Sequence, residues 1–188
     1  MSDPRPISRH VAERIRIVAL DVDGVLTDGG IYLGATDAGE RVEMKRFEIT
    51  DGLGIRLLQQ AGIQVAIITG RESAAVRLRA EELDIGECHQ DRTAAKLPIM
   101  QALIERLQIE WEAVAVMGDD LPDLPLLRRA GLSAAVGNAV PEVRAEAHWV
   151  ASRRGGRGAV REFAEAILRA RGTWTEAAER YVREREAE

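Results

Sequence analysis

Residues 15–28 read IRIVALDVDGVLTD, and this stretch decides the fold. The apolar run that begins at Ile15 shows little alternation of polar and apolar residues, which is typical of a parallel strand covered on both faces. The run ends at Asp21 and Asp23, two carboxylates separated by one residue. Catalytic groups of open α/β sheets lie at the carboxyl ends of such strands, so we expect both aspartates to face a cleft.

Two carboxylates at one strand end repel each other, and partial burial also opposes their ionisation. A hard cation offsets both effects, since Mg²⁺ is bound through one or two carboxylates together with substrate phosphate. An aspartate can also be the nucleophile that forms an aspartyl-phosphate. A strand that simply ends in a polar turn gives the same pattern, so the rest of the chain must discriminate between the two interpretations.

Composition narrows the class of protein. The 188 residues suit one α/β domain, and the formal net charge of −5 with 4% aromatic residues argues against a nucleic-acid-binding protein. The sequence contains no apolar stretch near the roughly 18 residues of a membrane span, and residues 1–13 have no signal-peptide core. The single cysteine, Cys88, excludes an internal disulfide. We therefore expect a cytoplasmic protein with no nucleic-acid or membrane partner.

Apolar strands alternate with helical segments along the rest of the chain, which predicts a parallel sheet. Asp51 is expected to cap a helix over residues 52–61, ahead of a strand at residues 63–70. The further helices are expected at 72–83 and 95–107, and the further strands at 85–89, 113–117 and 132–136. The predicted fold is a Rossmann-like three-layer α/β sandwich over residues 15–170, with a projecting β-hairpin at 31–49. A frayed tail at 1–14 and a helical tail at 171–188 flank it.

Polar residues also follow the second expected strand and begin the helix at 95–107. Thr69 and Gly70 end the strand, where a hydroxyl beside a glycine suits a phosphate oxygen. Taken by itself, this pair is explained more simply by an ordinary strand-to-helix turn in which the threonine is the cap. Lys96 lies at or just before the helix start, because Pro98 fits only the first turn. An ammonium there opposes the helix dipole, which a bound anion would compensate, although a solvated lysine is the simpler interpretation of this position alone.

The strand at 113–117 ends in GDDLPD and repeats the pattern of the first strand. Gly118 allows a tight exit, and Asp119, Asp120 and Asp123 follow within five residues. Such carboxylates can bind a metal directly or hold its waters. The acidic ends of two apolar strands therefore favour a metal site over a helix start that happens to be acidic.

These motifs, in this order, resemble the four motifs of the haloacid dehalogenase-like phosphohydrolases. The matching residues are Asp21-Val22-Asp23, Thr69, Lys96 and Gly118-Asp119-Asp120-x-x-Asp123. Residues 50–56 (TDGLGIR), 68–71 (ITGR) and 155–162 (GGRGAVRE) further resemble the branch that lacks a cap domain and contains the 3-deoxy-D-manno-octulosonate 8-phosphate phosphatases. With these stretches the resemblance reaches nearly the whole chain.

The resemblance implies a role for each matching residue. Asp21 would be the nucleophile and an Mg²⁺ ligand, and Asp23 would act as acid and base while its backbone carbonyl also binds the metal. Thr69 and Lys96 would hold phosphoryl oxygens, as transfer of a phosphoryl group requires. Asp119 would bind Mg²⁺, supported by Asp120 and Asp123. The candidates for contact with the substrate are Thr50, Asp51, Gly52, Arg56, Gly70, Arg71, Arg79 and Arg157.

The implied activity is Mg²⁺-dependent hydrolysis of a sugar-acid phosphate, with 3-deoxy-D-manno-octulosonate 8-phosphate favoured. The family stretch RDGYG is replaced here by Thr50-Asp51-Gly52-Leu53-Gly54, which leaves 2-keto-3-deoxynononate 9-phosphate open as the substrate. Members of this branch form tetramers through such a hairpin, and a neighbour's C-terminal segment closes the site, so a homotetramer is expected.

Two other functional classes compete with this interpretation. A phosphoacceptor receiver domain also combines acidic residues, a threonine and a lysine around Mg²⁺. Its phosphorylated aspartate stands alone on a central strand, however, whereas Asp21 and Asp23 share one motif here. A non-catalytic scaffold is disfavoured because every motif is intact.

Overall fold

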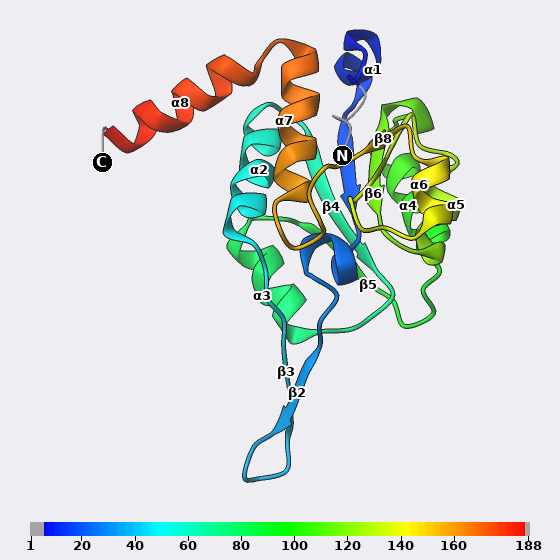
Figure 1. Cartoon of the computed structure of the whole chain (residues 1–188), viewed down its shortest axis with the longest axis vertical. Coiled ribbons are helices and arrows are strands. Elements are labelled where there is room, and N and C mark those ends of the chain that lie inside the picture. The colour runs from blue at the N-terminus through cyan, green and yellow to red at the C-terminus, as the bar shows by residue number, and fades with distance from the viewer. Residues whose placement is uncertain (1–5, 187–188) are drawn as a thin grey trace.

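The computed structural model describes residues 6–186 and contains one six-stranded parallel sheet (Figure 1). The strand order is β5-β4-β1-β6-β7-β8. The strands are β1 (Ile17–Leu20), β4 (Gln64–Thr69), β5 (Glu87–Gln90), β6 (Val114–Gly118), β7 (Leu132–Ala135) and β8 (Trp149–Val150). The predicted Rossmann-like parallel sheet is confirmed.

Strand β1 occupies the centre of the sheet, and all four of its residues are buried. Its last residue, Leu20, pairs with Ile67 of β4 on one side and Met117 of β6 on the other. The chain moves outward from β1 to β4 and β5, then crosses back to β6, β7 and β8. This reversal of direction places the topological switch point, where α/β proteins bind ligands, at the carboxyl end of β1.

Helices cover both faces of the sheet and complete the three predicted layers (Figure 1). One face carries α2 (Ile49–Gln60), α3 (Ala74–Glu82) and α7 (Ala159–Arg171), and the other carries α4 (Lys96–Leu107), α5 (Leu124–Leu127) and α6 (Pro141–Glu146). Right-handed crossovers between parallel strands require this division. Helix α7 packs against α2, and its Phe163 is fully buried, with its ring centroid 5.1 Å from that of Trp149.

The predicted hairpin projects from the body beyond the carboxyl edge of the sheet (Figure 1). It consists of β2 (Tyr32–Ala35) and β3 (Arg41–Met44), paired antiparallel with Tyr32 opposite Met44. Tyr32 and Met44 are more than half exposed, as is Leu33 on the other face. These apolar side chains of the hairpin are therefore uncovered within this chain.

The terminal segments lie at the other end of the molecule. We expected a frayed N-terminal tail, and residues 1–5 lie outside the described part of the chain, but Arg9–Arg14 form a helix, α1, with Ala12 buried. Arg171 at the end of α7 donates a hydrogen bond to the carbonyl of Ala12 (2.8 Å) and so fixes α1 in place. Helix α8 (Trp174–Glu186) leaves the body at the end opposite the hairpin (Figure 1). None of the helices within residues 6–186 has the length and apolar character needed to cross a membrane.

Candidate active site

The loop after β1 is tightly folded around one glycine. Asp21 follows the strand directly and is 8% exposed. Gly24 has a φ of +99°, and a Cβ atom there would lie 2.0 Å from Oδ2 of Asp119. The buried Thr27 hydroxyl donates to the carbonyl of Val22 (3.2 Å) and accepts the N–H of Gly24 (3.4 Å). Glycine at position 24 therefore lets the Asp119 carboxylate approach the Asp21 loop.

A buried lysine connects the acidic ends of β1 and β6. Lys96 Nζ lies 2.5 Å from Oδ1 of Asp21 and 2.6 Å from Oδ1 of Asp123, and all three residues are buried. The other oxygen of Asp123 accepts the backbone N–H of Asp119 (2.9 Å) and of Asp120 (3.4 Å). Lys96 is the first residue of α4, as expected, and these two carboxylates compensate the ammonium at that helix start.

Three carboxylates converge beside this lysine. Oxygen atoms of Asp21, Asp119 and Asp123 lie within 4.8 Å of one another. Burial, together with the negative charges of Asp21 and Asp123, raises the pKa of Asp119 to about 8. Burial and the charge of Asp123 also raise the pKa of Asp21, against the lowering effect of Lys96. One ammonium does not neutralise three carboxylates, and a cluster of hard oxygen donors with uncompensated charge fits Mg²⁺.

Asp120 and Asp23 were also expected at the metal, but their carboxylates have partners outside the carboxylate cluster. The Asp120 carboxylate is exposed and accepts the N–H of Leu121 (2.7 Å), so it caps the following turn. The Asp23 side chain forms ion pairs with Lys45 and with Arg71, whose Nε lies 3.6 Å from Oδ2. Asp123, for which only a supporting role was expected, belongs to the carboxylate cluster itself.

Thr69 and the loop before Lys96 complete the site on the β5 side. Thr69 is buried at the end of β4, and its hydroxyl oxygen accepts the N–H of Arg71 (3.4 Å). A Cβ atom on Gly70 would lie 2.8 Å from the Cβ of Ala94, so the loops after β4 and β5 are in contact. The strand ends that carry the aspartates and Thr69 therefore lie at one edge of the sheet with the start of α4, which carries Lys96, as predicted.

Lys45 is a site residue that the sequence analysis missed. It follows β3 at the base of the hairpin, and its side chain has no exposed surface. Its ammonium contacts Asp23 and lies 3.7 Å from Oε1 of Glu43. A compositional signal existed, because the chain contains only two lysines, Lys45 and Lys96, among its 26 basic residues. Both contact a carboxylate of the DVD motif.

The structure gives Asp51 a different task from the one expected. Helix α2 begins at Ile49, so Asp51 lies inside its first turn and does not cap it. The buried Asp51 carboxylate instead accepts the N–H groups of Gly158 (3.3 Å) and Arg161 (2.8 Å) at the start of α7. Burial raises its pKa to about 6, against the lowering effect of these hydrogen bonds. Asp51 therefore joins α2 to α7, and no oxygen of it is directed at the carboxylate cluster.

Three more substrate candidates on α2 and α3 are engaged in packing. Arg56 donates to the carbonyl of Glu82 (2.6 Å) at the end of α3, away from the carboxyl edge. Arg79 donates to the carbonyl of Glu48 (3.3 Å), and a Cβ atom on Gly52 would lie 2.5 Å from its guanidinium. These residues are not brought to the carboxylate cluster. The remaining candidate on α2, Thr50, is exposed in the first turn.

The glycine-rich stretch at 155–158 packs directly on the loop after β1. A Cβ atom on Gly155 would lie 1.5 Å from the carbonyl oxygen of Gly24. The N–H of Gly156 donates to the carbonyl of Val25 (2.8 Å), and Arg157 lies 3.4 Å from the Asp28 carboxylate. This contact brings Arg157 to the rim of the Asp21 loop.

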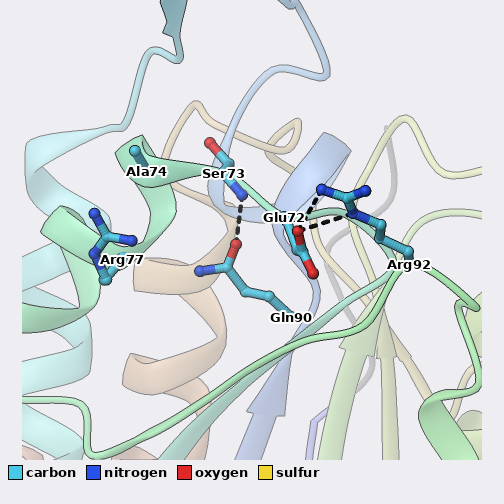
Figure 2. Close-up of a pocket in the computed structure, with 6 residues that line it drawn as sticks. All are labelled: Glu72, Ser73, Ala74, Arg77, Gln90 and Arg92. Atoms are coloured by element: carbon cyan, nitrogen blue, oxygen red, sulfur yellow. Dashed lines mark hydrogen bonds and ion pairs between the residues drawn. The ribbon is translucent and has the colours of Figure 1, made fainter.

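A cavity of about 370 Å³ opens between the loops after β4 and β5. Figure 2 shows its lining residues, Glu72, Ser73, Ala74, Arg77, Gln90 and Arg92. Gln90 accepts the N–H of Ser73 (2.6 Å), and Glu72 is paired with Arg92 (Figure 2). Glu72, which lines the cavity, directly follows Arg71 in the chain.

The comparisons with known proteins agree with this geometry. Residues 91–162 match the haloacid dehalogenase-like hydrolase family. The 3-deoxy-D-manno-octulosonate 8-phosphate phosphatase KdsC of Salmonella typhi is 46% identical over 175 residues, which cover 92% of this chain and 90% of that protein. The chain belongs to this phosphatase family. It is therefore a phosphoric monoester hydrolase of the haloacid dehalogenase-like type.

A second sequence relative and a crystal structure show the same similarity. KdsC of Escherichia coli K12 is 45% identical, with the same coverage of 92% and 90%. A crystal structure of the Moraxella catarrhalis phosphatase, in complex with a magnesium ion, a phosphate ion and a KDO molecule, is 40% identical and has a TM-score of 0.85. The similarity covers 92% of this chain and 97% of that chain.

Proposed function

We propose that this protein hydrolyses 3-deoxy-D-manno-octulosonate 8-phosphate to the free sugar acid and inorganic phosphate. The observation that carries the proposal is the buried pairing of Lys96 with Asp21, beside Asp119 and Asp123, at the switch point of the sheet. The relatives named for this substrate match over nine-tenths of the chain.

Each residue of the cluster then has a chemical task. Mg²⁺ held by Asp21, by Asp119 and by the backbone carbonyl of Asp23, with Asp123 beside them, would supply positive charge to the phosphoryl oxygens. Lys96 and the Thr69 hydroxyl bind the remaining phosphoryl oxygens, and the ion pair with Lys96 fixes the orientation of Asp21.

The reaction proceeds in two displacements. An Asp21 oxygen attacks phosphorus, the bond from phosphorus to the sugar oxygen breaks, and Asp23 gives its proton to that oxygen. Asp23 then takes a proton from water, whose oxygen attacks the phosphorus of the aspartyl-phosphate. The bond from phosphorus to Asp21 breaks, which releases inorganic phosphate and restores the carboxylate.

The organic part of the substrate lies, in this proposal, over Arg71 and the adjoining cavity. Arg71 contacts Asp23 and is partly exposed, and the cavity beside it presents Arg77 and Gln90. Guanidinium groups suit the carboxylate of a sugar acid. Gly70, which allows the close loop contact, and Arg157 on the rim remain candidates with Arg71.

We further propose a homotetramer in the cytoplasm, assembled through the hairpin. The exposed Tyr32, Leu33 and Met44 give the hairpin apolar surface that a second copy would cover. Helix α8 leaves from the end opposite the hairpin, so a C-terminal segment that closes a site would come from a neighbouring subunit. The single unpaired cysteine, Cys88, is compatible with a reducing compartment.

A substrate screen tests the proposed function. Release of inorganic phosphate is measured from 3-deoxy-D-manno-octulosonate 8-phosphate, 2-keto-3-deoxynononate 9-phosphate and p-nitrophenyl phosphate, with Mg²⁺ and with excess chelator. We expect Mg²⁺-dependent turnover and the highest kcat/KM for the first compound. A higher kcat/KM for the nine-carbon compound would make 2-keto-3-deoxynononate 9-phosphate the substrate. Stoichiometric phosphorylation of the protein without turnover would instead show a receiver-type switch.

A further inference from the structure

The Asp23 carboxylate is held in a closed ring of alternating charges. Lys45 contacts Oδ1 of Asp23, and Arg71 Nε lies 3.6 Å from Oδ2. Glu43 lies between the same two cations, 3.7 Å from Lys45 Nζ and 3.2 Å from the Arg71 guanidinium. Three elements supply the ring: the loop after β1, the end of the hairpin and the loop after β4. Both oxygens of the Asp23 carboxylate therefore have a cationic partner.

The burial of Lys45 indicates that this ring is more than a surface ion pair. Its side chain has no exposed surface, whereas those of Asp23 and Arg71 are 21% and 41% exposed. A lysine ammonium is withdrawn from water only at a substantial cost, which carboxylate partners must offset. Lys45 lies immediately after β3, where a solvated position beside the hairpin would avoid that cost. The sequence and the fold instead direct its ammonium at one oxygen of Asp23.

We propose that Lys45 is a positioning residue that fixes the orientation in which the Asp23 carboxylate exchanges its proton. The inference rests on the proposed function, in which Asp23 is the acid and base. Glu43 supports Lys45 from the other side and links it to Arg71. The base of the hairpin thus contributes to the chemistry of its own subunit, separately from any contact that the hairpin makes with another copy.

Proton donation to the leaving group gives a selective readout. The nitrophenolate of p-nitrophenyl phosphate departs with little need for a proton, whereas the alkoxide of 3-deoxy-D-manno-octulosonate 8-phosphate requires one. A misplaced Asp23 therefore lowers kcat for the sugar phosphate much more than for the nitrophenyl ester. A merely structural loss would lower both values together.

The test compares kcat for both esters in Lys45→Met, Lys45→Arg and Arg41→Met. Lys45→Met is expected to lose about 10²-fold in kcat for the sugar phosphate, the scale of a misplaced catalytic group, and less than about 3-fold for the nitrophenyl ester. Lys45→Arg retains the charge and should restore part of the loss. Arg41, which is 68% exposed and contacts Glu43 but neither oxygen of Asp23, is the matched control and should leave the ratio unchanged.

The proposal would be overturned if Lys45→Met left the ratio of kcat for the sugar phosphate to kcat for the nitrophenyl ester unchanged, whether both values fell equally or neither fell. If Lys45→Met does not fold, Glu43→Gln tests the same ring, and it should shift the ratio in the same direction by a smaller factor. Asp23→Asn distinguishes a failure of the positioning role of Lys45 from a failure of the acid–base role of Asp23. A selective loss in Asp23→Asn without one in the Lys45 variants refutes the positioning role alone, whereas no selective loss in Asp23→Asn refutes the proposed mechanism itself.

Discussion

At the scale of single residues, one buried ammonium group partly compensates the negative charge of the clustered carboxylates. Lys96 lies between Asp21 and Asp123, and Asp119 adds a third carboxylate to the cluster. These residues could be predicted because each stands in a short motif at a strand end or a helix start. Lys45 stands in no such motif, so the rarity of lysine in this chain was the one signal that could have pointed to it.

The first prediction concerns the phosphoryl-binding charge of Lys96. Lys96→Ala removes the cation beside Asp21, and we expect kcat to fall by about 10²–10³-fold, the usual effect of losing one such donor. Inhibition by vanadate, measured at steady state, should weaken in parallel. Lys45→Met, which removes a cation that contacts Asp23 and not Asp21, should keep the vanadate inhibition constant near that of the parent. Equal constants in Lys96→Ala and the parent would remove Lys96 from the phosphate site.

The second prediction is that Mg²⁺ binding releases protons. The pKa of Asp119 is raised to about 8 in the absence of metal by burial and by Asp21 and Asp123. Below this pH the carboxyl group is mostly protonated, and it must lose its proton to bind Mg²⁺. The apparent affinity should therefore rise by up to about tenfold per pH unit from pH 6 to 8 and level off above. Isothermal titration calorimetry in buffers of different ionisation enthalpy measures both quantities, and a pH-independent affinity without proton release would contradict this prediction.

At the scale of elements, the start of α7 controls how the nucleophile loop is packed. Asp51 in α2 accepts two N–H groups at the start of α7, and the glycines just before that helix touch Gly24 and Val25. The sequence predicted that residues 50–56 and 155–162 were important, but it assigned Asp51 to the substrate. The contact of Asp51 with α7 could not be predicted, because its partner Arg161 is more than a hundred residues away along the chain.

The third prediction follows from the contact between these two loops. Gly155→Ala would place a Cβ atom 1.5 Å from the carbonyl oxygen of Gly24, so the Asp21 loop must shift. We expect weaker Mg²⁺ binding, a loss of kcat and a lower Tm. Gly86→Ala is the matched control, because a Cβ atom at Gly86 meets no atom within 4 Å. If calorimetry and kinetics show the two variants to be alike, the glycine-rich stretch does not support the site.

At the scale of the whole molecule, the parallel sheet was predicted from the sequence, whereas the strand order that places the site comes from the structure. Long apolar runs such as Ile17–Leu20 predicted buried parallel strands, and right-handed crossovers place the connecting helices on the faces of the sheet. The short helix Arg9–Arg14 was not predicted, since its position depends on Arg171 near the other end of the chain. Local patterns thus predict elements, while contacts between distant residues determine where the ends of the chain pack.

The fourth prediction concerns assembly through the hairpin. Replacing Tyr32, Leu33 and Met44 together by serine removes the three most exposed apolar side chains of the hairpin. Light scattering should then show a smaller assembly than the parent forms, with most activity toward p-nitrophenyl phosphate retained and a lower kcat/KM for the sugar phosphate. Leu78→Ser, on an equally exposed apolar residue of α3, should leave both the assembly and the activity unchanged. A parent protein that is monomeric and fully active would refute the assembly proposal.

The central claim is that Asp21 becomes phosphorylated during turnover, and an acid-quenched single turnover tests it directly. The enzyme is mixed with Mg²⁺ and 3-deoxy-D-manno-octulosonate 8-phosphate that carries a radiolabelled phosphoryl group, quenched in acid within milliseconds, and digested. The account predicts a hydroxylamine-labile phosphate on the peptide that contains Asp21 in the parent, and neither label nor turnover in Asp21→Asn. Undiminished turnover in Asp21→Asn, or label on a peptide without Asp21, would contradict it.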